Sequence, residues 1–315
     1  RLPSIFSGLV ATIFFYLISR KYFKPLNSLA ASFALLAMPI YFQSLRTAGP
    51  DMTFTALVMA QIYLFVTIKD SEVSSSRWKI VAFGACISLT FFVRSMVAFL
   101  PIVSMLPLIF SRRYSRFRTF WFWTVVGLLL GSIPLILNLY AVFVDHGYAG
   151  VSPLIAFASN KADLSELNLS LSIPFYFSRL LLLTFPFSIC ILSRINIRSS
   201  SFKISALLTE INSLSIFFPL IYFLILSSMG ARHYHYLTPL VPLFALNIAR
   251  IDLLERRKQY KFEAYLGGLL GLIYSLGAFA LLFMRQELFG FSSGFVFIVL
   301  IFSSVSCWYV FTAKL

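Results

Sequence analysis

Runs of about 20 apolar residues recur along the whole 315-residue chain, and they constrain the fold more than any other feature. Such runs are long enough to cross a bilayer as helices, and they are longer than most buried helices of soluble proteins. Only 12% of the residues are charged, whereas soluble domains have about 25%. The sequence therefore predicts an all-α fold, a polytopic bundle of transmembrane helices.

Charged and polar breaks divide this predicted bundle, a single domain over residues 1–315, into about eleven helices. The one long polar connection, residues 144–173, is expected to form a loop on the outer face of the membrane. The predicted helices cover residues 4–20, 27–44, 52–68, 79–93, 95–110, 120–143, 174–193, 213–229, 236–250, 264–283 and 291–311.

The basic residues give these helices an orientation. Of the 26 Lys and Arg residues, 19 fall in one set of alternate connections and 7 at the opposite ends of the helices. Cytoplasmic connections are enriched in Lys and Arg, so the first set is predicted to be cytoplasmic and Arg1 to lie outside. An odd number of helices that begins outside also predicts a preceding helix, absent here, that runs outward from the cytoplasm.

Composition argues against two other kinds of site. The net charge of +15 suggests nucleic-acid binding, but the basic residues are distributed between apolar helices and form no single face. Cys86, Cys190 and Cys307 all lie inside apolar runs without a CxxC spacing. They are interpreted as small packing residues and not as metal ligands, and no cofactor is predicted.

The basic residues on the outer side are the most informative, because the topology rule does not account for them. Arg46 and Asp51 flank a tight turn, and Asp51 is expected in the first turn of a helix that begins near Pro50. Asp51 is either a helix-capping residue paired with Arg46 or a carboxylate presented to a polar substrate. Arg94 lies among apolar residues, where a cation either has a functional partner or extends to the headgroups.

Two further outer segments carry polar residues. The segment Arg232 to Pro242 contains Arg232, His233, His235 and Tyr236 at one membrane boundary. Three interpretations remain open: contact with a phosphate or a sugar, anchoring at the interface, and a weak metal site of two histidines. The 144–173 connection carries three acids, a lysine and a histidine, and its length favours a functional role.

Five short motifs, all predicted to lie on the outer side, resemble one known family. They are similar to motifs of the GT-C glycosyltransferases, specifically the protein O-mannosyltransferases and bacterial aminoarabinose transferases. The resemblance covers this chain from residue 1 to about 250. Phe91 to Arg94 takes the place of the family's LTKG stretch, with Arg for Lys and no Gly. The other four are Arg1 to Leu9 (RLPSxLxGL), Arg46 to Asp51 (R…PD), Pro174 to Phe187 (PxYY…PW, with Phe for Trp) and Arg232 to Pro239 (KRxxYLLP).

This resemblance implies a membrane enzyme that transfers a sugar from a polyprenyl-phosphate donor to an acceptor on the outer, periplasmic or lumenal, face. The acceptor would be a glycolipid, a polysaccharide or a protein. The enzyme would lie in a bacterial inner membrane. Asp51 would assist catalysis, and Arg46, Arg94, Arg232, His233, His235 and Tyr236 would bind substrate. The family's main catalytic acid precedes its RLPS motif, so the resemblance also implies a fragment that lacks the first helix and loop and is inactive by itself.

Two other classes fit a bundle of this size. A secondary transporter would carry ionisable groups near the middle of the membrane, often in repeated halves. The acids here avoid the centres of the predicted helices, and the two halves show no repeat. A lipid-linked polysaccharide polymerase or ligase would need a large outer loop rich in Arg and His, whereas residues 144–173 contain one Lys and one His. The transferase is therefore the favoured interpretation.

Overall fold

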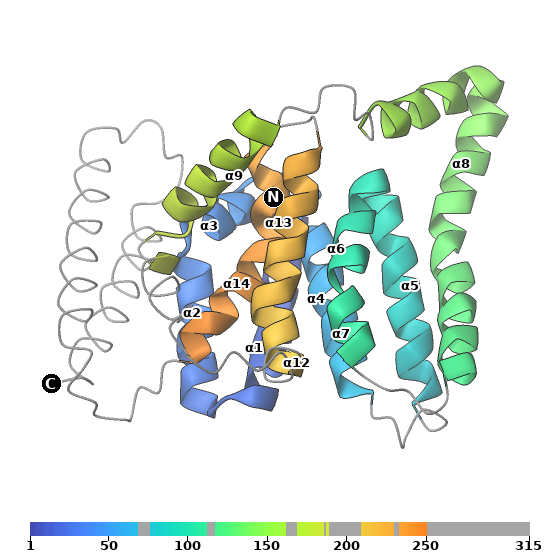
Figure 1. The fold of residues 1–315 in the computed structure, drawn as a ribbon. Helices are drawn as coiled ribbons and strands as arrows, with labels where there is room; N and C mark the ends of the chain where they lie inside the picture. Colours follow the sequence, from blue (N-terminus) through green and yellow to red (C-terminus); the bar gives the residue numbers. More distant parts are fainter. Residues whose placement is uncertain are drawn as a thin grey trace, which may run out of the picture.

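The computed structural model describes residues 1–68, 76–111, 117–161, 169–185, 187–188, 209–229 and 233–250. Within these ranges every regular element is a helix, as the sequence predicts (Figure 1). The predicted helices 264–283 and 291–311 lie outside the described residues.

Four helices form the N-terminal part of the bundle: α1 (Leu2–Tyr22), α2 (Pro25–Ala37), α3 (Pro39–Arg46) and α4 (Asp51–Thr67). The prediction of one continuous helix over 27–44 is wrong, because α2 and α3 meet at a bend of 63°. Met38 at the bend has an extended conformation, with ψ of 127°. The cause is Pro39, since proline disfavours the helical conformation in the residue before it.

Proline also breaks the helix predicted over 95–110. After α5 (Arg77–Arg94), the chain forms the 3-10 turn η2 (Ser95–Ala98) and two short helices, α6 (Phe99–Ser104) and α7 (Leu106–Ser111). Pro101 and Pro107 lie in the first turns of α6 and α7, where a missing backbone N–H costs least. The segment is therefore a series of short helices.

The helix α8 (Phe117–Lys161) corrects the expectation of a loop over 144–173. The chain stays helical to Lys161 and becomes helical again at Leu169, where α9 (Leu169–Leu183) begins. Gly147 interrupts α8 with a φ of 61°, and the helix turns there, as Figure 1 shows. The first polar residues that suggested a loop thus lie in a kinked helix. Residues 162–168 lie outside the described part.

Five short elements complete the described chain: α12 (Glu210–Asn212), the π-helical turn η3 (Ser213–Phe217), α13 (Phe218–Ser228), the 3-10 turn η4 (Tyr234–Leu240) and α14 (Val241–Ala249). Pro219 has no N–H to donate to the Ser215 carbonyl four residues earlier. That carbonyl instead accepts a hydrogen bond of 3.0 Å from Nδ2 of Asn247. The side chain of α14 thereby stabilises the irregular turn that precedes α13.

Three helices of the described ranges are long and apolar enough to cross a membrane: Leu2–Tyr22, Arg118–Pro153 and Glu210–Ser228. A fourth span results if the bent pair α2 and α3 counts as one. The part of α8 before Gly147 is about 45 Å long at 1.5 Å per residue, which exceeds a hydrocarbon core of about 30 Å. The side chains that α8 exposes are mainly large and apolar, as contact with lipid requires.

The two ends of the bundle differ in their polar contacts. At one end, called the basic end, Lys21 Nζ lies 3.4 Å from a Glu210 carboxylate oxygen and also donates to the Val66 carbonyl. At the other end, called the site end, Ser4 Oγ donates to the Gly49 carbonyl over 3.3 Å. Arg20, Lys21 and Lys24 therefore lie at the end away from Asp51, as the alternating charge pattern predicts.

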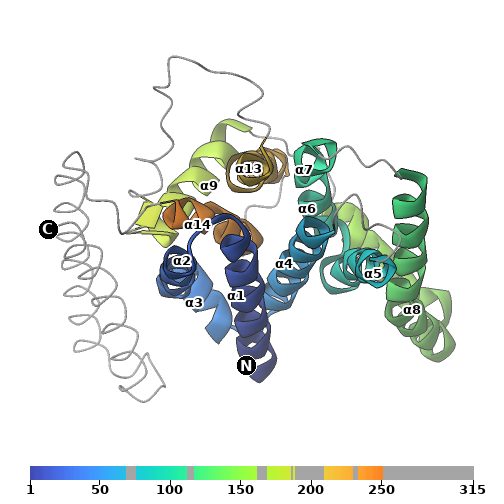
Figure 2. The same cartoon turned by 90° about the horizontal axis from the view of Figure 1, so that it is seen from below.

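Glycine allows α5 and α8 to pack closely at one edge of the bundle (Figures 1 and 2). A Cβ atom on Gly127 would lie within 2.1 Å of the Val81 carbonyl oxygen, and one on Gly84 within 2.2 Å of the Thr124 carbonyl oxygen. Ser88 Oγ adds a hydrogen bond of 2.6 Å to the Leu128 carbonyl. Small residues commonly permit such backbone approach between membrane helices.

Replacing Gly127 with Leu should separate α5 from α8, because the added side chain meets backbone and cannot be accommodated by rotation. We expect a loss of about 1–3 kcal/mol or more in the free energy of unfolding, measured as a lower melting temperature in detergent. Ala141→Leu, on an exposed position of the same helix, is the matched control. Equal melting temperatures for the two variants would contradict the close packing.

Candidate functional site

Asp51 is placed at the site end by the turn that precedes α4. It is the first residue of this helix, directly after Pro50, and its side chain is 15% exposed. The positive end of the helix dipole favours a carboxylate at that position. Gly49, two residues earlier, is tied to α1 through Ser4. The N-terminus of α4 is thus fixed relative to α1, and it carries a nearly buried negative charge.

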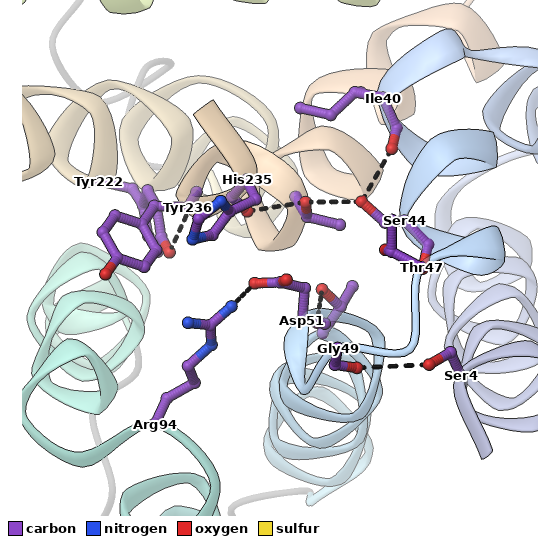
Figure 3. Close-up of polar contacts among 12 residues, drawn as sticks. Ser4, Ile40, Ser44, Thr47, Gly49, Asp51, Arg94, Tyr222, His235 and Tyr236 are labelled. Atoms are coloured by element: carbon purple, nitrogen blue, oxygen red, sulfur yellow. Dashed lines mark hydrogen bonds and ion pairs between the residues drawn. The ribbon is translucent and has the colours of Figure 1, made fainter. Parts of the chain in front are cut away.

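Arg94, the last residue of α5, is the ion partner of Asp51 (Figure 3). Its side chain is only 10% exposed. One terminal guanidinium nitrogen contacts the Asp51 carboxylate, whereas the buried Nε has no hydrogen-bond partner among the described residues. A guanidinium has five N–H donors, so this cation retains capacity for another acceptor.

The turn η4 forms the third side of the site. The guanidinium carbon of Arg94 lies 5.3 Å from the centre of the Tyr236 ring, within the range of a cation–π interaction. The His235 ring is 4.7 Å from the Tyr236 ring, and the His233 ring is 5.2 Å from that of His235. Figure 3 shows His235 and Tyr236 beside the Arg94–Asp51 pair. An aromatic wall thus borders the two charges.

The remaining predicted site residues have different positions. Arg46 ends α3, and its guanidinium lies over the Phe42 ring at 5.8 Å, so the suggested pairing of Arg46 with Asp51 gives way to the pair with Arg94. Arg232 lies outside the described residues. Across the described ranges no group of three or more His, Cys, Asp or Glu side chains is arranged to hold a metal ion.

Sequence reasoning missed the buried hydroxyls that support η4. Tyr222 of α13 donates to the Tyr236 carbonyl over 3.0 Å, and the Tyr176 hydroxyl of α9 accepts the His233 N–H over 3.3 Å. Ser44 of α3 and Thr238 share a hydrogen bond of 3.1 Å between their hydroxyl oxygens. Single hydroxyls within apolar helices give little signal in sequence. Pro239 is a partial signal, because it has no N–H and the carbonyl that would accept one from this position needs another donor.

Taken together, these groups form a small polar site with one cation, one carboxylate and aromatic neighbours, surrounded by buried apolar side chains. Low polarity around such charges strengthens their interaction with a charged ligand. Arg94 can bind an anion, and Asp51 can accept a proton or a sugar hydroxyl. This combination suits a ligand with an anionic group beside a hydroxylated group.

Comparison with known protein families gives a similarity for the N-terminal part of the chain. Residues 1–137 match the family model described as dolichyl-phosphate-mannose-protein mannosyltransferase. The first 137 residues are thus similar in sequence to this mannosyltransferase family. A search of curated protein sequences found no significant match.

Comparison with solved structures shows which fold the chain shares. Crystal structures of ArnT from Cupriavidus metallidurans, in the apo state and bound to undecaprenyl phosphate, both superpose with a TM-score of 0.66 at 16% sequence identity. The alignments cover 100% and 99% of this chain, which spans 61% of the length of the ArnT chain. The protein is accordingly a multi-pass membrane protein with an ArnT-like arrangement of helices.

The residue after Arg94 has a strained backbone. Ser95 has φ of 50° and ψ of −129°, a conformation that glycine adopts easily and other residues rarely. The LTKG motif that resembles this stretch has glycine directly after its lysine, the position of Ser95 here. The end of α5, which places Arg94, is therefore formed at a conformational cost.

Replacing Ser95 with Gly should remove that cost and stabilise the protein by about 1 kcal/mol. The measurement is the melting temperature in detergent. Ser95→Ala is the matched control, because alanine also loses the hydroxyl but keeps the Cβ atom that opposes positive φ. A rise in melting temperature with Ala equal to that with Gly would show that backbone strain is not the cause.

Proposed function

We propose that this chain belongs to the GT-C glycosyltransferases, and that the whole protein transfers a sugar from a polyprenyl-phosphate donor to an acceptor on the outer face of the membrane. The observation that carries the proposal is the nearly buried Arg94–Asp51 pair beside the aromatic wall of η4. A phosphate-linked sugar has an anion next to hydroxyl groups, and a cation next to a carboxylate complements both. The undecaprenyl phosphate bound by ArnT, whose fold this chain shares, supports the choice of a lipid phosphate.

Arg94 is proposed to bind the phosphate of the donor. Its Nε has no hydrogen-bond partner among the residues that the structure describes. This Nε and the remaining N–H groups supply donors in a setting where a charge-assisted hydrogen bond is strong. As the sugar–phosphate bond breaks, negative charge increases on the phosphate, and a fixed cation stabilises it. Tyr236 and His235 border this position, and Arg46, His233 and Arg232 are proposed to contribute further contacts to substrate.

Asp51 is proposed to assist the acceptor hydroxyl or to orient the sugar. In the free protein Arg94 neutralises its carboxylate. A phosphate that binds Arg94 competes with Asp51 for the same guanidinium, so the carboxylate becomes available when the donor is in place. A general base of this kind typically contributes about 10²–10⁴-fold to a rate.

The acceptor class proposed is a glycolipid, a polysaccharide or a protein hydroxyl, and the proposed location is a bacterial inner membrane with the site facing outward. The charge pattern supports this sidedness, because Lys21 and its basic neighbours lie at the end of the bundle away from Asp51. The family match favours a transferase over the secondary transporter and over a lipid-linked polymerase or ligase.

Replacing Asp51 with Asn should change binding and transfer in opposite directions. Undecaprenyl phosphate should bind as tightly as before or more tightly, because Asn no longer competes as an anion for Arg94. Transfer from a polyprenyl-phosphate sugar should fall by about 100-fold or more in membranes that contain the whole protein, with the first helix and loop that the resemblance implies. Binding is measured by thermophoresis in detergent, and transfer by release of the labelled sugar from the donor.

Arg94→Gln tests the other half of the pair and should weaken undecaprenyl phosphate binding by about tenfold or more. Arg77→Gln is the matched control, because Arg77 begins α5 at the opposite end of the same helix. Equal affinities of the two Arg variants would refute the phosphate role of Arg94.

For Asp51→Asn, unchanged transfer would show that Asp51 only caps its helix and takes no part in the reaction.

A further inference from the structure

Tyr222 is fully buried on α13 and lies outside the group of residues proposed to touch the substrate. Its hydroxyl donates a hydrogen bond of 3.0 Å to the backbone carbonyl of Tyr236. Tyr236 is the residue whose ring borders the Arg94 guanidinium. Figure 3 shows Tyr222 beside Tyr236 and across from Arg94. One buried hydroxyl thus connects α13 to the wall of the site.

Pro239 explains why this carbonyl needs a donor from outside the turn. In a 3-10 turn the carbonyl of each residue accepts the N–H of the third residue along the chain. For Tyr236 that residue is Pro239, which has no N–H. The Tyr222 hydroxyl donates to this carbonyl, and an unsatisfied carbonyl in the same buried place would be costly.

Other hydroxyls anchor the same turn from different helices. Thr238 Oγ1 donates to the His235 carbonyl over 2.8 Å and is linked to Ser44 on α3. The Tyr176 hydroxyl on α9 accepts the His233 N–H. These bonds fix the backbone around His233, His235 and Thr238, whereas Tyr222 acts on the residue that contacts Arg94. Its contribution to the charged site is therefore the most direct of the set.

We propose that Tyr222 is a positioning residue of the donor site, which fixes the Tyr236 ring against Arg94 so that the guanidinium faces the lipid phosphate. This inference rests on the proposed function, because it assigns Arg94 to phosphate binding. Tyr222 itself touches no substrate. Loss of its hydroxyl releases the Tyr236 backbone, the ring leaves the face of Arg94, and the cation loses its fixed orientation.

The test is a double-mutant cycle on the affinity for undecaprenyl phosphate, with the purified full chain in detergent. Tyr222→Phe keeps the buried ring and removes only the hydroxyl, and it should weaken binding by about tenfold. In a Tyr236→Leu background the same change should have an effect of less than about twofold, because the ring that Tyr222 positions is already absent. A purely structural role predicts equal effects in both backgrounds.

Tyr41→Phe is the matched control. Tyr41 is also fully buried, and its hydroxyl donates a hydrogen bond of 2.9 Å to the backbone carbonyl of Gly8. Gly8 belongs to α1, so this bond does not involve η4. Its removal should leave the affinity unchanged. Hydrogen exchange read by mass spectrometry provides a second measurement without ligand, and Tyr222→Phe, unlike Tyr41→Phe, should speed exchange in residues 233–240.

The outcomes separate the two proposals. If the unmodified chain does not bind undecaprenyl phosphate, the proposed function fails, and the positioning role fails with it. If the chain binds and Tyr222→Phe behaves like Tyr41→Phe in affinity and in exchange, the positioning role alone is overturned. Equal losses in the two backgrounds of the cycle would likewise overturn it, because Tyr222 would then act independently of Tyr236.

Discussion

The Arg94–Asp51 ion pair is the interaction on which the site depends. Each charge alone would be costly among apolar helices, and each neutralises the other. The pair also suits the helix dipoles, because Asp51 begins α4 and Arg94 ends α5. It joins two helices that are consecutive in sequence, and it leaves Arg94 with an unpartnered Nε within the described residues. A polar ligand can therefore enter by replacing one partner of an existing pair.

Proline shapes the surroundings of this pair. Pro39 bends the chain between α2 and α3, Pro219 leaves the Ser215 carbonyl to Asn247, and Pro239 leaves the Tyr236 carbonyl to Tyr222. In each of the last two cases a buried side chain from another helix takes the place of the missing backbone donor. Irregular backbone within a membrane bundle is tolerated where protein groups satisfy it in this way.

The sequence was sufficient for features that follow from hydropathy and charge. Helices α1, α4 and α5 begin and end within two residues of the predicted bounds, and Asp51, Arg94, His235 and Tyr236 come together at the end away from Lys21. The bend at Met38 was missed because the apolar pattern continues across it. The helix over 144–161 was missed because polar residues suggested a loop. Hydropathy also says nothing about which cation pairs with Asp51, and tertiary contact selects Arg94 over the nearby Arg46.

The most direct test of the account is a structure of the protein with undecaprenyl phosphate bound. The account predicts the phosphate within hydrogen-bonding distance of the Arg94 guanidinium, with the Asp51 carboxylate separated from it and the Tyr236 ring still against the cation. A phosphate bound elsewhere, for example beside Lys21 at the basic end, with the Arg94–Asp51 pair intact, would contradict it.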